Sequence, residues 1–150
     1  MNTPPPSNDP QTNIELRLRT MRILWLAMVM SVGLYYVFTL FAWRSRGIQS
    51  NGMMSLMLFG IGLLTTAISF PVKSKLLTQA TEKQQVPMVQ QAYVVAFAIT
   101  EVAALLGMID FFLTSNPYYY IPFIVSACGQ LLHFPRREHV VNAMFRTPGF

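Results

Sequence analysis

The stretch of sequence that decides the fold is Val89 to Leu113, VQQAYVVAFAITEVAALLGMIDFFL. Its only charged residues are Glu101 and Asp110. A helix needs about 20 apolar residues to cross the hydrocarbon core of a bilayer, so a run of this length predicts a transmembrane helix. Three further apolar runs, at residues 21–43, 53–70 and 118–134, predict three more spans, of which the last is short.

The composition of the whole chain agrees with a membrane protein. Hydrophobic residues make up 53% of the 150 residues and charged residues 11%, whereas soluble domains carry roughly 25% charge. The formal net charge is +5, but the basic residues cluster at the ends of the apolar runs, which is typical of contact with anionic lipid and not with nucleic acid. The single cysteine, Cys128, excludes an internal disulfide, and no neighbouring histidine or cysteine indicates a metal site.

We therefore expect one all-α domain, an integral membrane four-helix bundle at residues 21–134. The polar, proline-rich residues 1–20 predict a disordered N-terminal tail, and the first apolar run is too long for a cleaved signal peptide. Pro71 is expected to end the second span or to kink it into a short extension. Asn116 and Pro117 predict a tight turn. Residues 135–150 are expected to form a tail, either amphipathic on the inner leaflet or disordered.

The distribution of charge predicts the orientation of the bundle. Of the 11 Lys and Arg residues, all except Arg44 and Arg46 lie in the N-terminal flank, the 71–88 connection or the C-terminal tail. Short loops that are rich in Lys and Arg stay in the cytoplasm. The prediction is an up-down-up-down bundle in the inner (plasma) membrane, with both termini cytoplasmic.

Glu101 is the most informative residue because it lies near the middle of the third span. A charged group at that depth is costly, so an intramembrane acid indicates a functional site by default. One interpretation is a carboxyl group that binds a proton or an ion. The other is a protonated acid that joins two helices by a hydrogen bond.

The neighbours of Glu101 predict how its helix packs. Small residues recur at steps of three and four along one face, forming a helix-packing stripe of Ala92, Ala96, Thr100, Ala103 and Gly107. Ser126 and Gln130 lie on a polar face of the fourth span, at about the depth of Glu101. We expect Ser126, Gln130, or Thr65 or Thr66 of the second span, to hydrogen-bond with Glu101. The possible ion- or proton-binding set is therefore Glu101, Gln130, Ser126, Thr65 and Thr66.

Little else in the sequence indicates chemistry. Asp110 is expected to reach lipid headgroups or water, and His133 to interact with the dipole at the end of its helix. The sequence contains no pattern of a nucleophile with a base, no phosphate-binding loop and no metal-binding motif. We therefore predict no enzymatic activity, no cofactor and no small-molecule substrate. The expected partners are lipid and other membrane subunits or a second copy.

Two resemblances follow from particular segments. Ile99 to Leu113, ITEVAALLGMIDFFL, resembles the carboxylate-bearing helix of rotary-ATPase proteolipid (c-type) subunits, in which glycine follows the membrane glutamate by six residues, as Gly107 follows Glu101. That resemblance implies a rotor site for a proton or sodium at Glu101. The chain departs from the family at Gly60-Ile61-Gly62, where a longer glycine repeat is expected, and before Gln85, where the family has arginine.

The whole chain more closely resembles small uncharacterised bacterial four-span inner-membrane proteins. The similarity rests on MRILWLAMVMSVGLYYV at residues 21–37, the third-span glutamate with its glycine, and LLHFPRRE at residues 131–138. It implies a location but no activity. The leading functional prediction is a non-enzymatic accessory or assembly subunit that packs through the helix-packing stripe, and the alternative is a proton- or sodium-binding or translocating subunit that uses Glu101.

Overall fold

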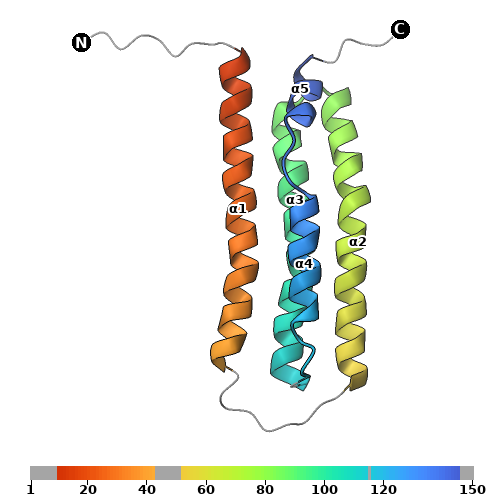
Figure 1. Cartoon of the computed structure of the whole chain (residues 1–150). Coiled ribbons are helices and arrows are strands. Elements are labelled where there is room, and N and C mark those ends of the chain that lie inside the picture. The colour runs from red at the N-terminus through yellow and green to blue at the C-terminus, as the bar shows by residue number, and fades with distance from the viewer. Residues whose placement is uncertain (1–9, 43–51, 115, 146–150) are drawn as a thin grey trace, which may run out of the picture.

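The computed structural model describes residues 10–42, 52–114 and 116–145, and these residues form helices without any strand. The predicted all-α class is therefore confirmed. The elements are α1 (Pro10–Ala42), α2 (Gly52–Glu82), α3 (Val86–Thr114), α4 (Ile121–Leu132) and α5 (Arg137–Phe145). Figure 1 shows α1 to α4 side by side with roughly parallel axes, and the short α5 at one end.

Three of these helices are long and apolar enough to cross a membrane. They are Ile14–Ala42 within α1, the whole of α2 and the whole of α3. The fourth predicted span is shorter than expected, because α4 has 12 residues, or about 18 Å of helix. Tyr118 to Tyr120 form a turn before it, and the chain leaves helical geometry at His133. Pro122 lies in the first turn of α4.

Helix α1 begins well before the predicted first span. The expectation of a disordered tail at residues 1–20 is wrong for residues 10–20, which are helical, and residues 1–9 lie outside the described part. Ile14, Leu18 and Met21 recur at steps of four and three and are buried. They pack in one apolar cluster with Ala80, Val89, Tyr93, Phe97, Val140 and Ala143. This burial against three other helices stabilises the extra turns.

Helix α2 continues through Pro71 to Glu82. Of the two alternatives predicted at Pro71, the end of the helix is therefore wrong, and the helical extension is longer than expected and takes up most of the predicted 71–88 connection. Proline is tolerated in membrane helices because neighbouring groups satisfy the freed backbone. Ala80, in the extension, is fully buried in the apolar cluster of α1. The turn to α3 is short, and Gln84 takes the left-handed conformation with φ 50° that commonly ends a helix.

The segment after α4 folds back onto the bundle. Residues 137–145 form α5, whose Val140 and Ala143 are fully buried against α1, α2 and α3. The expectation of a disordered tail at 135–150 is therefore wrong for these residues. The amphipathic alternative agrees with the helix, but the apolar face of α5 packs on the bundle. Residues 146–150 lie outside the described part.

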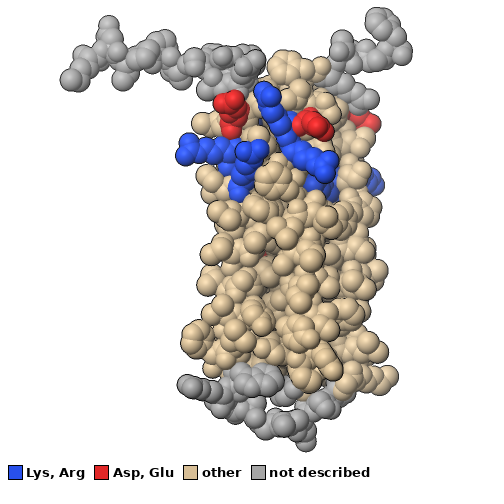
Figure 2. All heavy atoms as spheres, in the orientation of Figure 1, with Lys and Arg blue, Asp and Glu red and all other residues tan. Residues whose placement is uncertain are grey.

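The described Lys and Arg residues gather near the end of the bundle that carries α5 (Figure 2). We call this group the basic belt, and it consists of Arg17, Arg19, Arg22, Lys73, Lys75, Lys83, Arg136 and Arg137. Between the basic belt and the opposite end of the bundle, the face drawn in Figure 2 shows neither basic nor acidic side chains over most of its length. Arg44 and Arg46 lie outside the described residues.

Candidate functional site

Glu101 lies midway along α3 and faces α1. The Ser31 hydroxyl lies 2.7 Å from Glu101 Oε1, and Tyr35 interacts with the same carboxyl group. Ser31 and Tyr35 are four residues apart, so they occupy one face of α1. Glu101 is only partly buried within the chain. The site is therefore a carboxyl group between two helices, with the Ser31 hydroxyl of α1 hydrogen-bonded to it.

The hydrogens at this site can be counted. The Ser31 hydroxyl oxygen lies 2.7 Å from the Met28 carbonyl oxygen as well as 2.7 Å from Glu101. A hydroxyl group has one hydrogen and can donate to only one of them. When Ser31 donates to Met28, a protonated Glu101 can donate to Ser31. When Ser31 donates to Glu101, the ionised carboxylate is satisfied. One rotation of the hydroxyl thus accommodates both forms of Glu101.

The prediction that α2 or α4 supplies the partner of Glu101 is wrong. Ser126 donates to the Thr100 carbonyl at 2.8 Å, and Thr65 and Thr66 each donate to the Gly62 carbonyl at 2.9 Å. Successive residues on a helix point about 100° apart. The Thr100 side chain lies beside Gly129 of α4, and Glu101, the next residue, faces α1 instead. The short α3–α4 turn was visible in the sequence, whereas the position of α1 beside Glu101 was not.

Gln130 is fully buried, and neither its amide nitrogen nor its amide oxygen has a hydrogen-bond partner among the described residues. Its backbone carbonyl accepts a hydrogen bond of 2.8 Å from the Trp25 indole. A buried amide without partners is costly. Among the predicted site residues, Gln130 is thus the one whose polar side chain is buried although no described residue of this chain hydrogen-bonds to it.

The helix-packing stripe is used inside the chain. Ala92, Ala96, Thr100, Ala103 and Gly107 are all buried. A Cβ placed on Gly62 of α2 would lie 3.3 Å from Ala103. A Cβ on Gly107 would lie 2.9 Å from Pro122 of α4. The stripe therefore brings α2 and α4 close to α3, as small residues do in membrane helices, and it is not free for a partner.

Asp110 is a candidate that the sequence reasoning missed. It is 2% exposed, and each carboxylate oxygen has a hydroxyl partner: Ser55 donates to Oδ2 at 2.7 Å and Thr114 to Oδ1 at 2.6 Å. The Asn116 amide in turn donates to Ser55. A cavity of about 290 Å³ adjoins these groups. Asp110 was expected to reach headgroups or water, but it is buried. The spacing of Asp110 and Thr114, one helical turn apart, is the signal that could have indicated this pairing.

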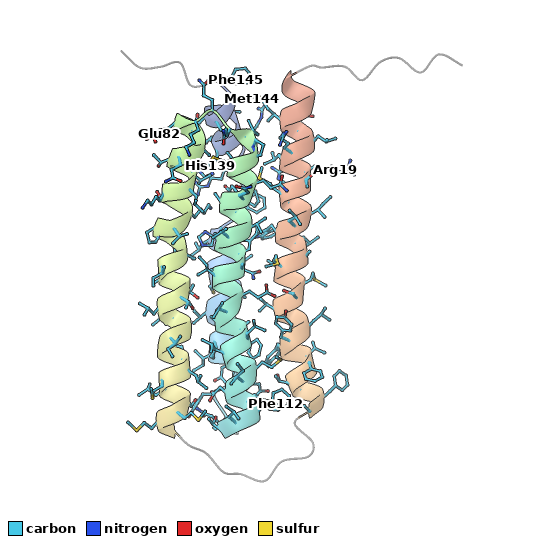
Figure 3. All side chains as sticks on the ribbon, turned by 180° about the vertical axis from the view of Figure 1, so that it is seen from behind. Arg19, Glu82, Phe112, His139, Met144 and Phe145 are labelled. Carbon is cyan, nitrogen blue, oxygen red and sulfur yellow. The ribbon has the colours of Figure 1, made fainter. Side chains whose placement is uncertain are left out.

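A second polar cluster lies at the opposite end, beside α5. The Tyr93 hydroxyl lies 2.6 Å from His139 Nδ1 and accepts the backbone N–H of Arg136 at 3.1 Å. Lys73 Nζ lies 4.2 Å from the centroid of the Tyr93 ring. Burial lowers the pKa of His139, and the charges of Lys73 and Arg136 lower it further. In Figure 3, His139 lies at the same end as Met144 and Phe145 of α5.

His133 is buried as well, at the C-terminal cap of α4. Its Nε2 lies 2.7 Å from the Ser69 hydroxyl, and its ring packs on Phe70 with centroids 4.4 Å apart. The sequence placed His133 correctly at the end of its helix. The partners on α2 became visible only in the structure, because α2 and α4 are not consecutive.

The chemistry available to these groups is proton exchange and hydrogen bonding. Among residues 10–42, 52–114 and 116–145, no group of three or more His, Cys, Asp or Glu residues could hold a metal ion. Comparison of the chain with protein-family models, with curated proteins and with solved structures finds no match.

Proposed function

We propose that the chain is a non-enzymatic, multi-pass inner-membrane protein that serves as an accessory or assembly subunit, and that another membrane subunit packs on the face formed by α1 and α3 around Glu101. In this arrangement α1 to α4 form an up-down-up-down bundle. The basic belt lies at the cytoplasmic surface. Both termini are cytoplasmic, because α1 starts and α5 lies at the end that carries the belt (Figures 1 and 2).

The observation that carries this proposal is the incomplete burial of Glu101. A carboxyl group near the middle of the bilayer is costly wherever lipid reaches it, and Glu101 is only partly buried within the chain. Helix α1 beside it is also sparsely covered by the rest of the chain. In its most apolar stretch 11% of the residues are buried, compared with 44% in the corresponding stretch of α3. A protein partner on this face would remove Glu101 from lipid.

Site-directed photocrosslinking in native membranes tests the proposal. A photoreactive residue at Leu105, which is 37% exposed and one helical turn from Glu101, should give a discrete protein adduct that mass spectrometry identifies. Ile61 on α2 is 48% exposed and is the matched control, from which we expect lipid adducts only. Lipid adducts alone from both positions would refute a partner on the α1–α3 face.

A specific observation favours a second candidate function. The Ser31 hydroxyl can turn between Met28 and Glu101, which lets Glu101 gain and lose a proton without repacking. This geometry supports the interpretation of Glu101 as a reversible proton or sodium site. In that role the chain would be a proton- or sodium-binding or translocating subunit.

Carbodiimide labelling distinguishes the two roles. A proton site reacts with a hydrophobic carbodiimide when the carboxyl group is protonated, so labelling of Glu101 should fall at high pH or in the presence of sodium. Peptide mass spectrometry reports the label, and the Glu101→Gln variant is the blank. An inert Glu101 in a chain that keeps its photocrosslinked partner supports the accessory role instead.

A further inference from the structure

A groove of about 600 Å³ opens on the surface of α1 beside the first residue of α5. It is lined by Glu15, Arg19, Arg22, Ile23, Leu26 and Arg137. The lining residues of α1 recur at steps of three and four, so they form one helix face. Figure 3 shows Arg19 at the same end of the molecule as α5. The groove therefore lies within the basic belt.

The charges that line the groove fit an anion. Arg19, Arg22 and Arg137 contribute three guanidinium groups, while Glu15 is the one acid among the lining residues. The Arg22 guanidinium carbon lies 5.6 Å from the centroid of the Phe134 ring, a contact that limits its motion. Planar guanidinium groups bind phosphate through paired hydrogen bonds.

Below the arginines the same face of α1 is apolar and accessible. Ile23 is 58% exposed, Leu26 54% and Met30 59%. These residues follow one another at steps of three and four in the direction away from the basic belt. The face thus changes from cationic to apolar along the helix, which is the order of headgroup and acyl chain in a lipid.

We propose that this groove is a binding site for an anionic phospholipid, with the phosphate headgroup between Arg19, Arg22 and Arg137 and an acyl chain along Ile23, Leu26 and Met30. Free phosphate would use the guanidinium groups but not the apolar face. The proposal requires that the chain lies in a bilayer and does not depend on a partner at Glu101.

Native mass spectrometry of the full chain in mild detergent tests the site. The protein is titrated with phosphatidylglycerol or with phosphatidylcholine of the same acyl chains. Arg19→Gln/Arg137→Gln removes two exposed charges from the groove, and Lys75→Gln/Lys83→Gln removes the same charge from exposed positions of the basic belt outside it. Arg22 is left in place because it packs on Phe134.

We expect the unmodified chain to bind phosphatidylglycerol more tightly than phosphatidylcholine, and the groove variant to bind phosphatidylglycerol about tenfold more weakly, since charge-assisted hydrogen bonds are lost. The lysine control should change by less than about twofold. The charge-conserving Arg19→Lys/Arg137→Lys pair should lose less than the glutamine pair, since a lysine still attracts phosphate as a point charge.

Three results would overturn the proposal. The first is that the chain binds the two lipids equally well, and the second is that the groove and lysine variants lose the same affinity for phosphatidylglycerol. The third is that inorganic phosphate, titrated in the same way, binds at the same concentration as phosphatidylglycerol. Circular dichroism confirms that each variant is helical. Because photocrosslinking from Leu105 reports the partner face separately, loss of the lipid site and loss of the proposed function give different results.

Discussion

Ser55 on α2 donates a hydrogen bond of 2.7 Å to the carboxylate of Asp110 on α3, at the end of the bundle opposite the basic belt. Both residues are nearly inaccessible, with exposures of 5% and 2%. Asp110 thus joins α3 to α2, whereas Glu101, through Ser31, joins α3 to α1. The two carboxyl groups of α3 thus have separate structural surroundings.

The Ser55→Ala substitution should lower the free energy of unfolding by about 1 to 2 kcal/mol, because Asp110 would lose a hydroxyl donor in a buried setting. SDS titration in mixed micelles measures this change. Thr78→Ala is the matched control, since the exposed Thr78 hydroxyl bonds to the Ser74 carbonyl of its own helix. An equal effect of the two substitutions would contradict a special role for the Ser55–Asp110 contact.

The Gln130→Met substitution should raise the free energy of unfolding by about 1 kcal/mol. It replaces a buried amide that lacks partners among the described residues with an apolar side chain of similar size. The same micelle titration reports the change. A destabilised Gln130→Met protein would indicate that the amide binds a water or another group.

The Gly129→Ala substitution should lower the free energy of unfolding by about 1 to 3 kcal/mol through overpacking. The new Cβ would lie 2.8 Å from Thr66 Cγ2 and 3.0 Å from Thr100 Cγ2, and both threonines are buried with hydrogen-bonded hydroxyls. At Gly60 a new Cβ meets nothing within 4 Å. Gly60→Ala should therefore leave the stability unchanged or raise it by less than about 1 kcal/mol.

The stability of the folded chain should fall as the pH drops below about 6.5, the ordinary pKa of histidine. Burial and the nearby charges of Lys73 and Arg136 lower the pKa of His139 in the folded protein, against a smaller opposing effect of Glu138. The unfolded chain therefore takes up the proton first, and its free energy falls relative to the folded form. The full contribution of neutral His139 is present above that pH and is lost as the pH falls toward the folded pKa.

Unfolding titrations between about pH 8 and pH 5 measure this dependence. His139→Gln should flatten it, while limited proteolysis should detect earlier release of α5 in the unmodified chain at the acidic end. Stability that rises on acidification, or an unchanged slope in His139→Gln, would show that burial and the charges of Lys73 and Arg136 do not favour neutral His139 in the folded chain.

The sequence predicted those helices that form because of the residue types within the helix itself. The third span was expected at residues 89–113 and α3 covers Val86–Thr114, because a run of apolar residues is enough to form a helix in a bilayer. At Pro71 the sequence left open whether α2 ends or continues, because neighbouring groups in the fold decide whether a proline ends a helix. The extra turns of α1 and the packing of α5 onto the bundle were not predicted for a similar reason. Ile14 and Val140 carry weak local signals and are buried only because distant helices cover them.

By itself the sequence determined that long apolar segments exist, that small residues line one face of α3, and that basic residues gather at the ends of the apolar segments. These properties depend on residue type and spacing alone. Only the tertiary structure decided that Glu101 meets Ser31 of α1 and that Asp110 meets Ser55 of α2. It also decided that the side-chain amide of Gln130 is buried without a partner among the described residues. The rotation of each helix about its axis follows from contacts between residues far apart in the chain, and such contacts leave no periodic signal in a single sequence.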